Sequence, residues 1–173
     1  MNGVLAFELG AVKVPMTAAL GLQQQCAPIG GNTVLRLGNG AAVKQTTWRK
    51  QRITLTGDGW VPPGLGGLDY DGQLLLKCGL PEAIASTIVT VTLPAARRTD
   101  AGYLPFARAH LPGRDVETAV SMAGNVATVT AVTGAQAYTV WYYPQLTVIC
   151  EPPQTTFDGA GAAVAWELVA EEA

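Results

Sequence analysis

The sequence predicts an all-β fold, a β-sandwich or barrel of about a dozen short antiparallel strands with two long loops and at most one short helix. Apolar and polar residues alternate along much of the chain with the period of a strand. The 20 glycines and 11 prolines separate these stretches at short intervals. At 173 residues the chain is long enough for one domain with its own core, and we expect a single β-sandwich domain over residues 1–173.

The first hairpin is predicted in the N-terminal third. Residues 33–37 and 41–45 have strand character and enclose Asn39-Gly40. This pair tolerates the positive φ angles that a tight hairpin turn needs. The polar run before the hairpin, residues 23–32, contains a proline and two glycines, so we expect it to be a loop.

The central part of the chain has two strands that flank an insert. Residues 49–57 and 73–78 alternate as strands do, whereas residues 57–72 have no period. Apolar groups on a loop lose about 25 cal/mol per Å² to water unless they fold back on the domain or dock on a neighbour. We interpret the insert as an interfacial docking element with four anchor residues: Trp60, Leu65, Leu68 and Tyr70.

A long arm is predicted over residues 94–115, after a short helix of one or two turns at 81–86 and a strand at 87–93. The arm contains three prolines and no convincing period, and loops of this length are usually functional or interfacial. Arginine suits interfaces because its planar group makes several directed hydrogen bonds. The alternative is a mobile arm without a partner. The expected interface residues of this arm are Arg97, Arg98, Tyr103, Phe106 and Arg108.

The last third of the chain predicts a meander of strands and a closing strand. Tyr138, Val140 and Tyr142 fall on one face of the strand at residues 137–143, because side chains alternate across a strand. The meander strands are expected at 118–122, 126–132, 137–143 and 146–150, and the closing strand contains Val164, Trp166 and Leu168.

Charge is sparse and unevenly distributed. Charged residues make up 14% of the chain, against about 25% in ordinary soluble domains, which suggests that much of the surface is covered by other chains. Residues 9–57 contain six bases and no acid, and residues 115–173 contain seven acids and no base. On separate surfaces, these regions would steer copies head to tail. As neighbours in one fold, they would instead neutralise each other.

Few residues suggest catalysis, and we expect neither an enzyme nor a cofactor. His110 is the only histidine, so a His-based metal cluster is excluded and a catalytic triad would depend on it alone. A local hydrogen bond is the favoured role for His110. Cys26, Cys78 and Cys150 are far apart and are expected to be reduced, buried thiols, as in a protein that folds in a reducing cytoplasm.

Three aspartates and one basic stretch have simple interpretations. Asp58, Asp69 and Asp71 could converge on a calcium ion, but the other ligands of a calcium loop are missing, which favours turn-forming aspartates. The basic stretch 49–52 is too narrow for a nucleic-acid footprint, so no sequence-specific nucleic-acid binding is expected. The N-terminus lacks the pattern of a signal peptide, and no run predicts a membrane span.

Three segments resemble structural proteins of tailed bacteriophages, in particular the tail module of Mu-like siphophages. These segments, which together contain 49 of the 173 residues, are TTWRKQRITLTGDGWVPPGLGGLDYD, VTGAQAYTVWYYPQL and AWELVAEE. The resemblance implies a virion subunit, assembled in the host cytoplasm into homo-oligomeric rings, hexameric in most tail tubes, that contact other virion proteins. The insert and the arm would then bridge neighbouring subunits.

Other functions stay open. Tail-tube subunits usually carry a helix packed on the sandwich, and only residues 81–86 could supply one here, so a distal-tail, head-tail connector or capsid-decoration role is an alternative. A second class is a receptor- or carbohydrate-binding β-sandwich that uses Trp60, Tyr70 and Trp141 as stacking platforms. A third is a hydrolase that depends on His110 or the aspartates.

Overall fold

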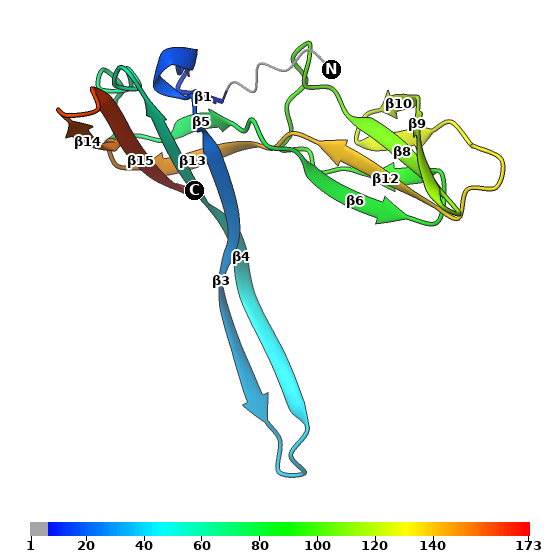
Figure 1. Cartoon of the computed structure of the whole chain (residues 1–173). Helices are drawn as coiled ribbons and strands as arrows, with labels where there is room; N and C mark the ends of the chain where they lie inside the picture. Colours follow the sequence, from blue (N-terminus) through cyan, green and yellow to red (C-terminus); the bar gives the residue numbers. More distant parts are fainter. Residues whose placement is uncertain (1–6) are drawn as a thin grey trace. The chain divides into compact units, whose positions relative to one another are not determined.

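The computed structural model describes residues 7–173 and is built almost entirely of strands (Figure 1). Within these residues there are fifteen strands and one short 3-10 helix, η1 (Met16–Ala18). The predicted all-β class is confirmed. Each sheet is open, with strands at two edges, so the barrel alternative is wrong for the part of the chain described.

The chain divides into two compact units. Unit 1 contains residues 7–8 and Leu76–Leu146, and unit 2 contains Leu9–Leu75 and Thr147–Ala173. The prediction of a single domain concerns independent folding, which this division does not test, and it stays a prediction. None of the helical segments in residues 7–173 has the length and hydrophobicity needed to cross a membrane.

Unit 1 is a two-layer β-sandwich. One layer has the order β10 (Val120–Ala123), β11 (Val126–Val129), β7 (Thr90–Thr92), and the other has the order β6 (Glu82–Ser86), β12 (Ala137–Tyr142), β8 (Phe106–Leu111), β9 (Arg114–Thr118). Side chains from both layers form one apolar core, and Tyr138, Val140 and Tyr142 share one buried face of β12, as the alternation predicted. The buried members of this core are Val91, Leu93, Ala107, Ala109, Ala127, Val129, Tyr138, Val140 and Tyr142.

Unit 2 is built on an eight-stranded sheet. Three strands of this sheet, β1, β5 and β13, contain the residues at which the chain changes from one unit to the other. The strand order is β2 (Val12–Lys13), β1 (Glu8–Leu9), β5 (Leu74–Lys77), β13 (Gln145–Cys150), β15 (Ala163–Glu172), β4 (Ala42–Gly59), β3 (Gln23–Arg36), and β14 (Gln154–Asp158) pairs with β15.

The closing strand of the chain carries the core of unit 2. Val164, Trp166 and Leu168 are buried on one face of β15 and alternate with exposed residues, as predicted. The indole Nε1 of Trp166 donates a 2.6 Å hydrogen bond to the Ala18 carbonyl oxygen at the end of η1. This bond satisfies a buried polar atom and fixes the short helix to the sheet.

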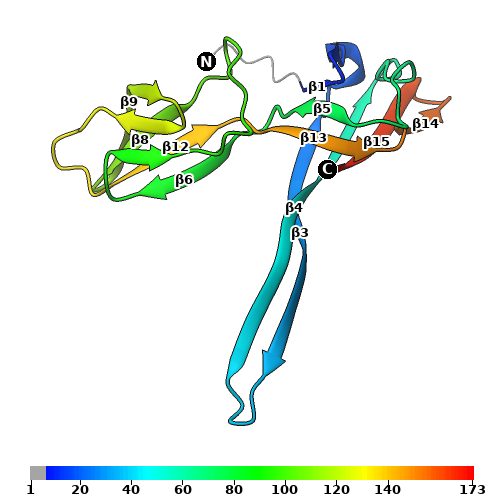
Figure 2. The same ribbon diagram turned by 180° about the vertical axis from the view of Figure 1, so that it is seen from behind.

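The predicted hairpin is present but much longer than expected. β3 and β4 contain 14 and 18 residues and pair from Gln23–Thr56 to Arg36–Ala42. Their outer part extends beyond the rest of unit 2 (Figures 1 and 2). The turn differs in detail from the prediction. Leu37 N–H donates to the Ala41 carbonyl at 2.9 Å, which leaves a three-residue loop in which Gly40 has a φ of 81°. Such loops place a glycine at their left-handed position.

The loop expected at residues 23–32 and the helix expected at residues 81–86 are strands. Residues 23–32 belong to β3, which is an edge strand and therefore tolerates the missing N–H of Pro28. The predicted helix at 81–86 is strand β6, which pairs with β12 over five residues. Its sequence, EAIAS, has strong helix formers, and the tertiary pairing overrides this local preference.

The arm predicted over residues 94–115 is shorter than expected, because its second half is the hairpin of β8 and β9. The inward residues of β8 are Ala107 and Ala109, whose small side chains conceal the alternation of a strand. The meander is also interrupted, because β12 pairs with β6 and β8 rather than with β11. The chain passes from one layer of the sandwich to the other between β11 and β12.

Candidate assembly surface

The outer part of the β3–β4 hairpin is a solvent-exposed ribbon, which we call the β-arm and define as residues 32–49. Every residue of this arm is exposed. Five of its large apolar side chains are about half exposed: Val34 at 56%, Leu35 at 52%, Leu37 at 52%, Val43 at 45% and Trp48 at 50%. Several exposed large apolar residues on one hairpin mark an interaction site more often than scattered ones do.

The two faces of the β-arm differ in chemistry. Leu35 lies opposite Val43, and Leu37 pairs with Ala41, so one face is apolar. Residues directly opposite each other in an antiparallel pair share a face. The other face contains Val34 opposite Lys44 and Arg36 opposite Ala42. The β-arm is therefore a ribbon with one apolar face and one basic face.

The backbone edges of the β-arm are also open. β4 pairs with β15 only between Arg52 and Gly59, and residues 42–49 of β4 pair only with β3 among the residues described. Unpaired N–H and C=O groups on such an edge are a template for pairing with another chain. Both strands of the β-arm present this template.

A bulge and two glycines connect the β-arm to the sheet. The pairing register shifts between Gly31 and Asn32, and the hydroxyl of Thr47 donates a 2.7 Å hydrogen bond to the Gly31 carbonyl. A Cβ added at Gly30 would lie 2.5 Å from the backbone oxygen of Trp48, a distance that no side chain accepts. The close approach of the two strands at this point therefore requires glycine.

A groove with acidic walls lies elsewhere on unit 2, over β13, β14 and β15. Its volume is about 490 Å³. Its lining includes the apolar residues Ile149, 55% exposed, and Val169, 42% exposed, and the acids Glu151, Glu167, Glu171 and Glu172. Burial, with the neighbouring Glu151 charge, raises the pKa of the Cys150 thiol in this groove, so the thiol stays protonated and unreactive.

The charges of the basic and acidic regions are only partly paired. Arg52 lies 2.5 Å from Glu171, and Lys50 lies 4.0 Å from Glu172. Among the residues described, however, Arg36 and Lys44 of the β-arm and the exposed Glu167 form no ion pair. Ion pairs within the chain therefore neutralise the bases of β4 that lie beside β15, whereas the β-arm keeps its positive charge.

The predicted interfacial insert at 57–72 folds back on its own unit for the most part. Leu65 is 1% exposed, and the Tyr70 hydroxyl donates a 2.8 Å hydrogen bond to the Leu65 carbonyl. Burial raises the pKa of Tyr70. Leu68 is partly buried, whereas Trp60 is 69% exposed. Trp60 is thus the residue of this predicted set that has most surface left for a partner.

The three aspartates near this insert behave differently from one another. The Asp69 side chain accepts a 3.1 Å hydrogen bond from the Asp71 N–H, as in an ordinary turn. Asp58 lies in β4, where its backbone pairs with Ala165. In residues 7–173 no group of three His, Cys, Asp or Glu side chains is placed to hold a metal ion.

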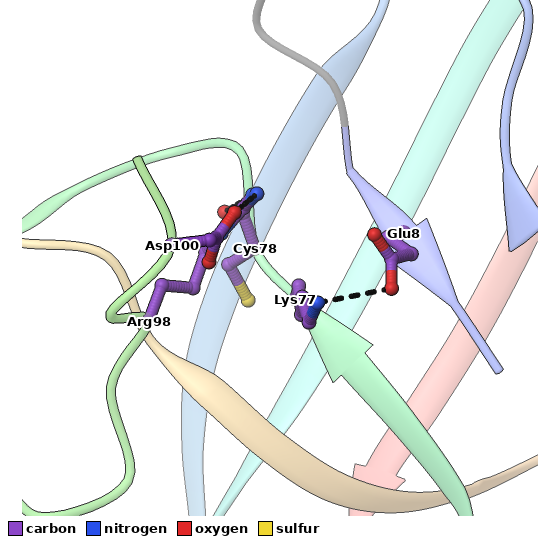
Figure 3. A network of polar contacts seen from close by, with 5 residues as sticks. All are labelled: Glu8, Lys77, Cys78, Arg98 and Asp100. Carbon is purple, nitrogen blue, oxygen red and sulfur yellow. Dashed lines mark hydrogen bonds and ion pairs between the residues drawn. The ribbon is translucent and has the colours of Figure 1, made fainter. Parts of the chain in front are cut away.

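Arg98, a predicted interface residue, is buried in unit 1 at 2% exposure (Figure 3). Its Nη2 and Nε lie 2.5 and 3.1 Å from the two carboxylate oxygens of Asp100, and its Nη1 donates to the Cys78 carbonyl at 3.0 Å. Its guanidinium lies 3.2 Å from the ring centre of Tyr103. These contacts anchor the segment that was predicted as the long arm, residues 94–115, and Arg98 has a structural role.

The same network has an electrostatic signature. The hydrogen bonds from Arg98 are the main cause that lowers the pKa of Asp100, since they favour its charged form. A second ion pair nearby joins Lys77 and Glu8 at 3.0 Å (Figure 3). Arg97 is held in a similar way, because its Nη1 donates to the Asn125 side chain at 2.8 Å.

An aromatic row lies on the outer face of the four-stranded sheet of unit 1. Phe106 stacks on Trp141 with ring centres 5.3 Å apart and planes within 6°. Tyr103 and Tyr143 meet edge to face at 5.0 Å. All four rings are partly buried, and Arg108 on the same strand as Phe106 is exposed. This row is the second surface that retains large side chains for a partner.

His110 lies in β8 and joins three adjacent strands. Its Nδ1 is 2.7 Å from Asp115 Oδ1, and its Nε2 is 2.7 Å from Thr139 Oγ1. In the tautomer that has its proton on Nδ1, His110 donates to Asp115 and accepts from the Thr139 hydroxyl. The order carboxylate, imidazole, hydroxyl is that of a hydrolase triad, but catalysis also needs donors aimed at a developing oxyanion. As the structure stands, these three groups form a hydrogen-bond chain across β9, β8 and β12.

Sequence reasoning predicted the hairpin but not its role as a surface. The residues of the hairpin were expected to be part of the sandwich. The interface was predicted on the insert at residues 57–72 and on the arm at residues 94–115. One signal was available, because Val34 and Leu35 are adjacent and thus put an apolar side chain on each face of one strand. No protein-family model matches the chain, and no curated protein matches it at a significant level.

Proposed function

We propose that this chain is a structural subunit that assembles with copies of itself into closed rings, as part of the tail of a bacteriophage. The subunit would act by presenting surfaces to its neighbours and would carry out no chemistry. Other virion proteins would contact the rings.

The β-arm is the observation that carries the proposal. Five half-exposed apolar side chains and two unpaired backbone edges on one projecting hairpin have a free-energy cost that burial against another chain would remove. The low share of charged residues, 14%, supports the same conclusion for the remaining surface. A head-to-tail contact that closes into a ring is favoured because the bases lie in residues 9–57 and the acids in residues 115–173.

The phage tail as the place of assembly is supported by the resemblance of the sequence. The resembling segments include TTWRKQRITLTGDG, which forms the second strand of the hairpin, and AWELVAEE, which forms most of β15. These strands adjoin each other in the sheet of unit 2. The distal tail, the head-tail connector and capsid decoration are places where the same kind of subunit would serve.

Carbohydrate binding is the second candidate function, and the stacked pair on unit 1 favours it. Trp141 has Phe106 on one side and Ala83 as its cross-strand neighbour on the other. Because the Ala83 side chain is small, a flat ligand that lies over β6 would meet the second face of the indole. If this is the function, a glycan array will give hits with the wild-type chain that Trp141→Ala abolishes.

Negative-stain electron microscopy and sedimentation velocity of the full chain test the assembly proposal. Rings or short tubes of uniform diameter are expected, with a sedimentation coefficient that rises with protein concentration. A chain that remains monomeric at high concentration would contradict the proposal.

A further inference from the structure

We propose that the β-arm of one copy docks in the acidic groove of the next copy, with its apolar face on Ile149 and Val169. The inference rests on the proposed function, since it names the contact through which the copies assemble. The groove is the one defined above over β13, β14 and β15 of unit 2.

Chemical complementarity connects these two surfaces. The β-arm has three apolar side chains on one face and two bases on the other, and the groove combines two exposed apolar residues with Glu151 and Glu167, the two of its four acids that form no ion pair with Lys50 or Arg52. Arg36 and Lys44 lie on the face of the β-arm opposite the one that contacts Ile149 and Val169. Their long flexible side chains reach the acids of the groove around the edge of the ribbon. Attraction between exposed charges also acts over about 8–10 Å at moderate salt.

The β-arm cannot fill the acidic groove of its own chain. Arg52 of β4 pairs with Glu171 at the groove, and Val43 lies nine residues further along the same continuous strand. At about 3.3 Å per residue, the apolar tip is roughly 30 Å from that point. Folding it back would break the β3–β4 pairing, so the occupant is a second copy.

The resulting contact is heterologous, because arm and groove are different surfaces. Every copy then offers one arm and one groove, and a succession of such contacts closes into a ring or continues as a filament. The open edges of the arm add backbone hydrogen bonds to this contact wherever a strand of the neighbour is accessible.

Paired charge reversals test the contact. The arm variant carries Arg36→Glu with Lys44→Glu, and the groove variant carries Glu151→Lys with Glu167→Lys. Each variant alone is expected to associate about 10- to 100-fold more weakly than the wild type, because attraction becomes repulsion at two sites. An equimolar mixture should recover assembly, since every contact in an alternating ring is then complementary.

Cross-linking locates the contact directly. A photo-activatable residue placed at Leu35 of the full chain, in a mixture of light and heavy isotope-labelled copies, should form intermolecular links to residues 149–154 or 167–172. The same probe at Leu104, which is 59% exposed in unit 1, is the matched control and should give none of these links. Circular dichroism of each variant verifies its fold.

The failures of the two proposals are distinguishable. If the wild-type chain assembles but the links from Leu35 fall outside the groove, or the mixture does not recover assembly, the docking inference is wrong and the assembly proposal stands. If the wild-type chain does not assemble, both are wrong. Links from Leu35 to a different protein would also overturn the inference.

Discussion

Removing the apolar face of the β-arm should weaken assembly while the chain stays folded. The perturbation is Leu35→Ala with Leu37→Ala and Val43→Ala, three side chains that are 52%, 52% and 45% exposed. Full burial of a Val or Leu side chain stabilises by about 1.5–3 kcal/mol, and about half of each side chain remains to be buried by a partner. With the retained alanine methyl groups subtracted, the loss is about 2–3 kcal/mol per contact, or roughly 30- to 150-fold in the association constant.

Sedimentation equilibrium over a range of concentrations measures this loss, and urea unfolding measures the stability of the fold. Because about half of each side chain is already covered by its own chain, each substitution should also lower the free energy of unfolding, by no more than about 1 kcal/mol. Ile88→Ala, at another exposed apolar residue (61%), is the control and should leave assembly unchanged. The reasoning is refuted if the triple variant assembles as the wild type does, or if its fold is strongly destabilised.

Two further predictions concern the structure that supports these surfaces. Gly30→Ala should destabilise the chain by about 1–3 kcal/mol in urea unfolding, because its Cβ would lie 2.5 Å from the Trp48 backbone oxygen, while Gly66→Ala, which has open space, should not. Asp100 should contribute stability above its ordinary pKa, about 3.8, and lose it as the pH falls through the lowered pKa of the folded state. Asp100→Asn should therefore cost about 1–2 kcal/mol at pH 7, because Arg98 loses a charged partner, and should flatten the dependence of Tm on pH below about 4; an unchanged pH profile would contradict this.

Sequence alternation predicted the strands that bury a large side chain at every second residue. β15, with Val164, Trp166 and Leu168, and the inward face of β12 are of this kind. The Asn39-Gly40 pair located the hairpin turn within one residue. In each case a local pattern and the tertiary environment agree, which is the condition under which local reasoning succeeds.

Local reasoning failed where tertiary pairing decides. β6 has the composition of a helix, and β8 buries only alanines, so neither has the hydrophobic period of a strand. The polar β3 is a strand because β4 supplies its hydrogen bonds over 14 residue pairs. No local pattern encodes such a partner.

The exposure of the predicted interface residues could not be read from the sequence for a related reason. The sequence shows that apolar residues occur in a loop or hairpin, but not whether the chain itself covers them. Leu65 and Arg98 were expected at an interface and are buried within their own units, whereas Leu35 and Leu37 were assigned to the fold and are exposed. Burial depends on where the rest of the chain passes, which only the three-dimensional structure specifies.

Hydrogen-deuterium exchange of the full chain tests most directly whether another copy covers the β-arm. Amides of residues 32–49 are compared between a dilute monomeric sample and the assembled fraction. Strong protection of these residues in the assembly, with little change at the exposed turn around Gly113, is the predicted result. Equal exchange of the β-arm in the two samples would contradict the account.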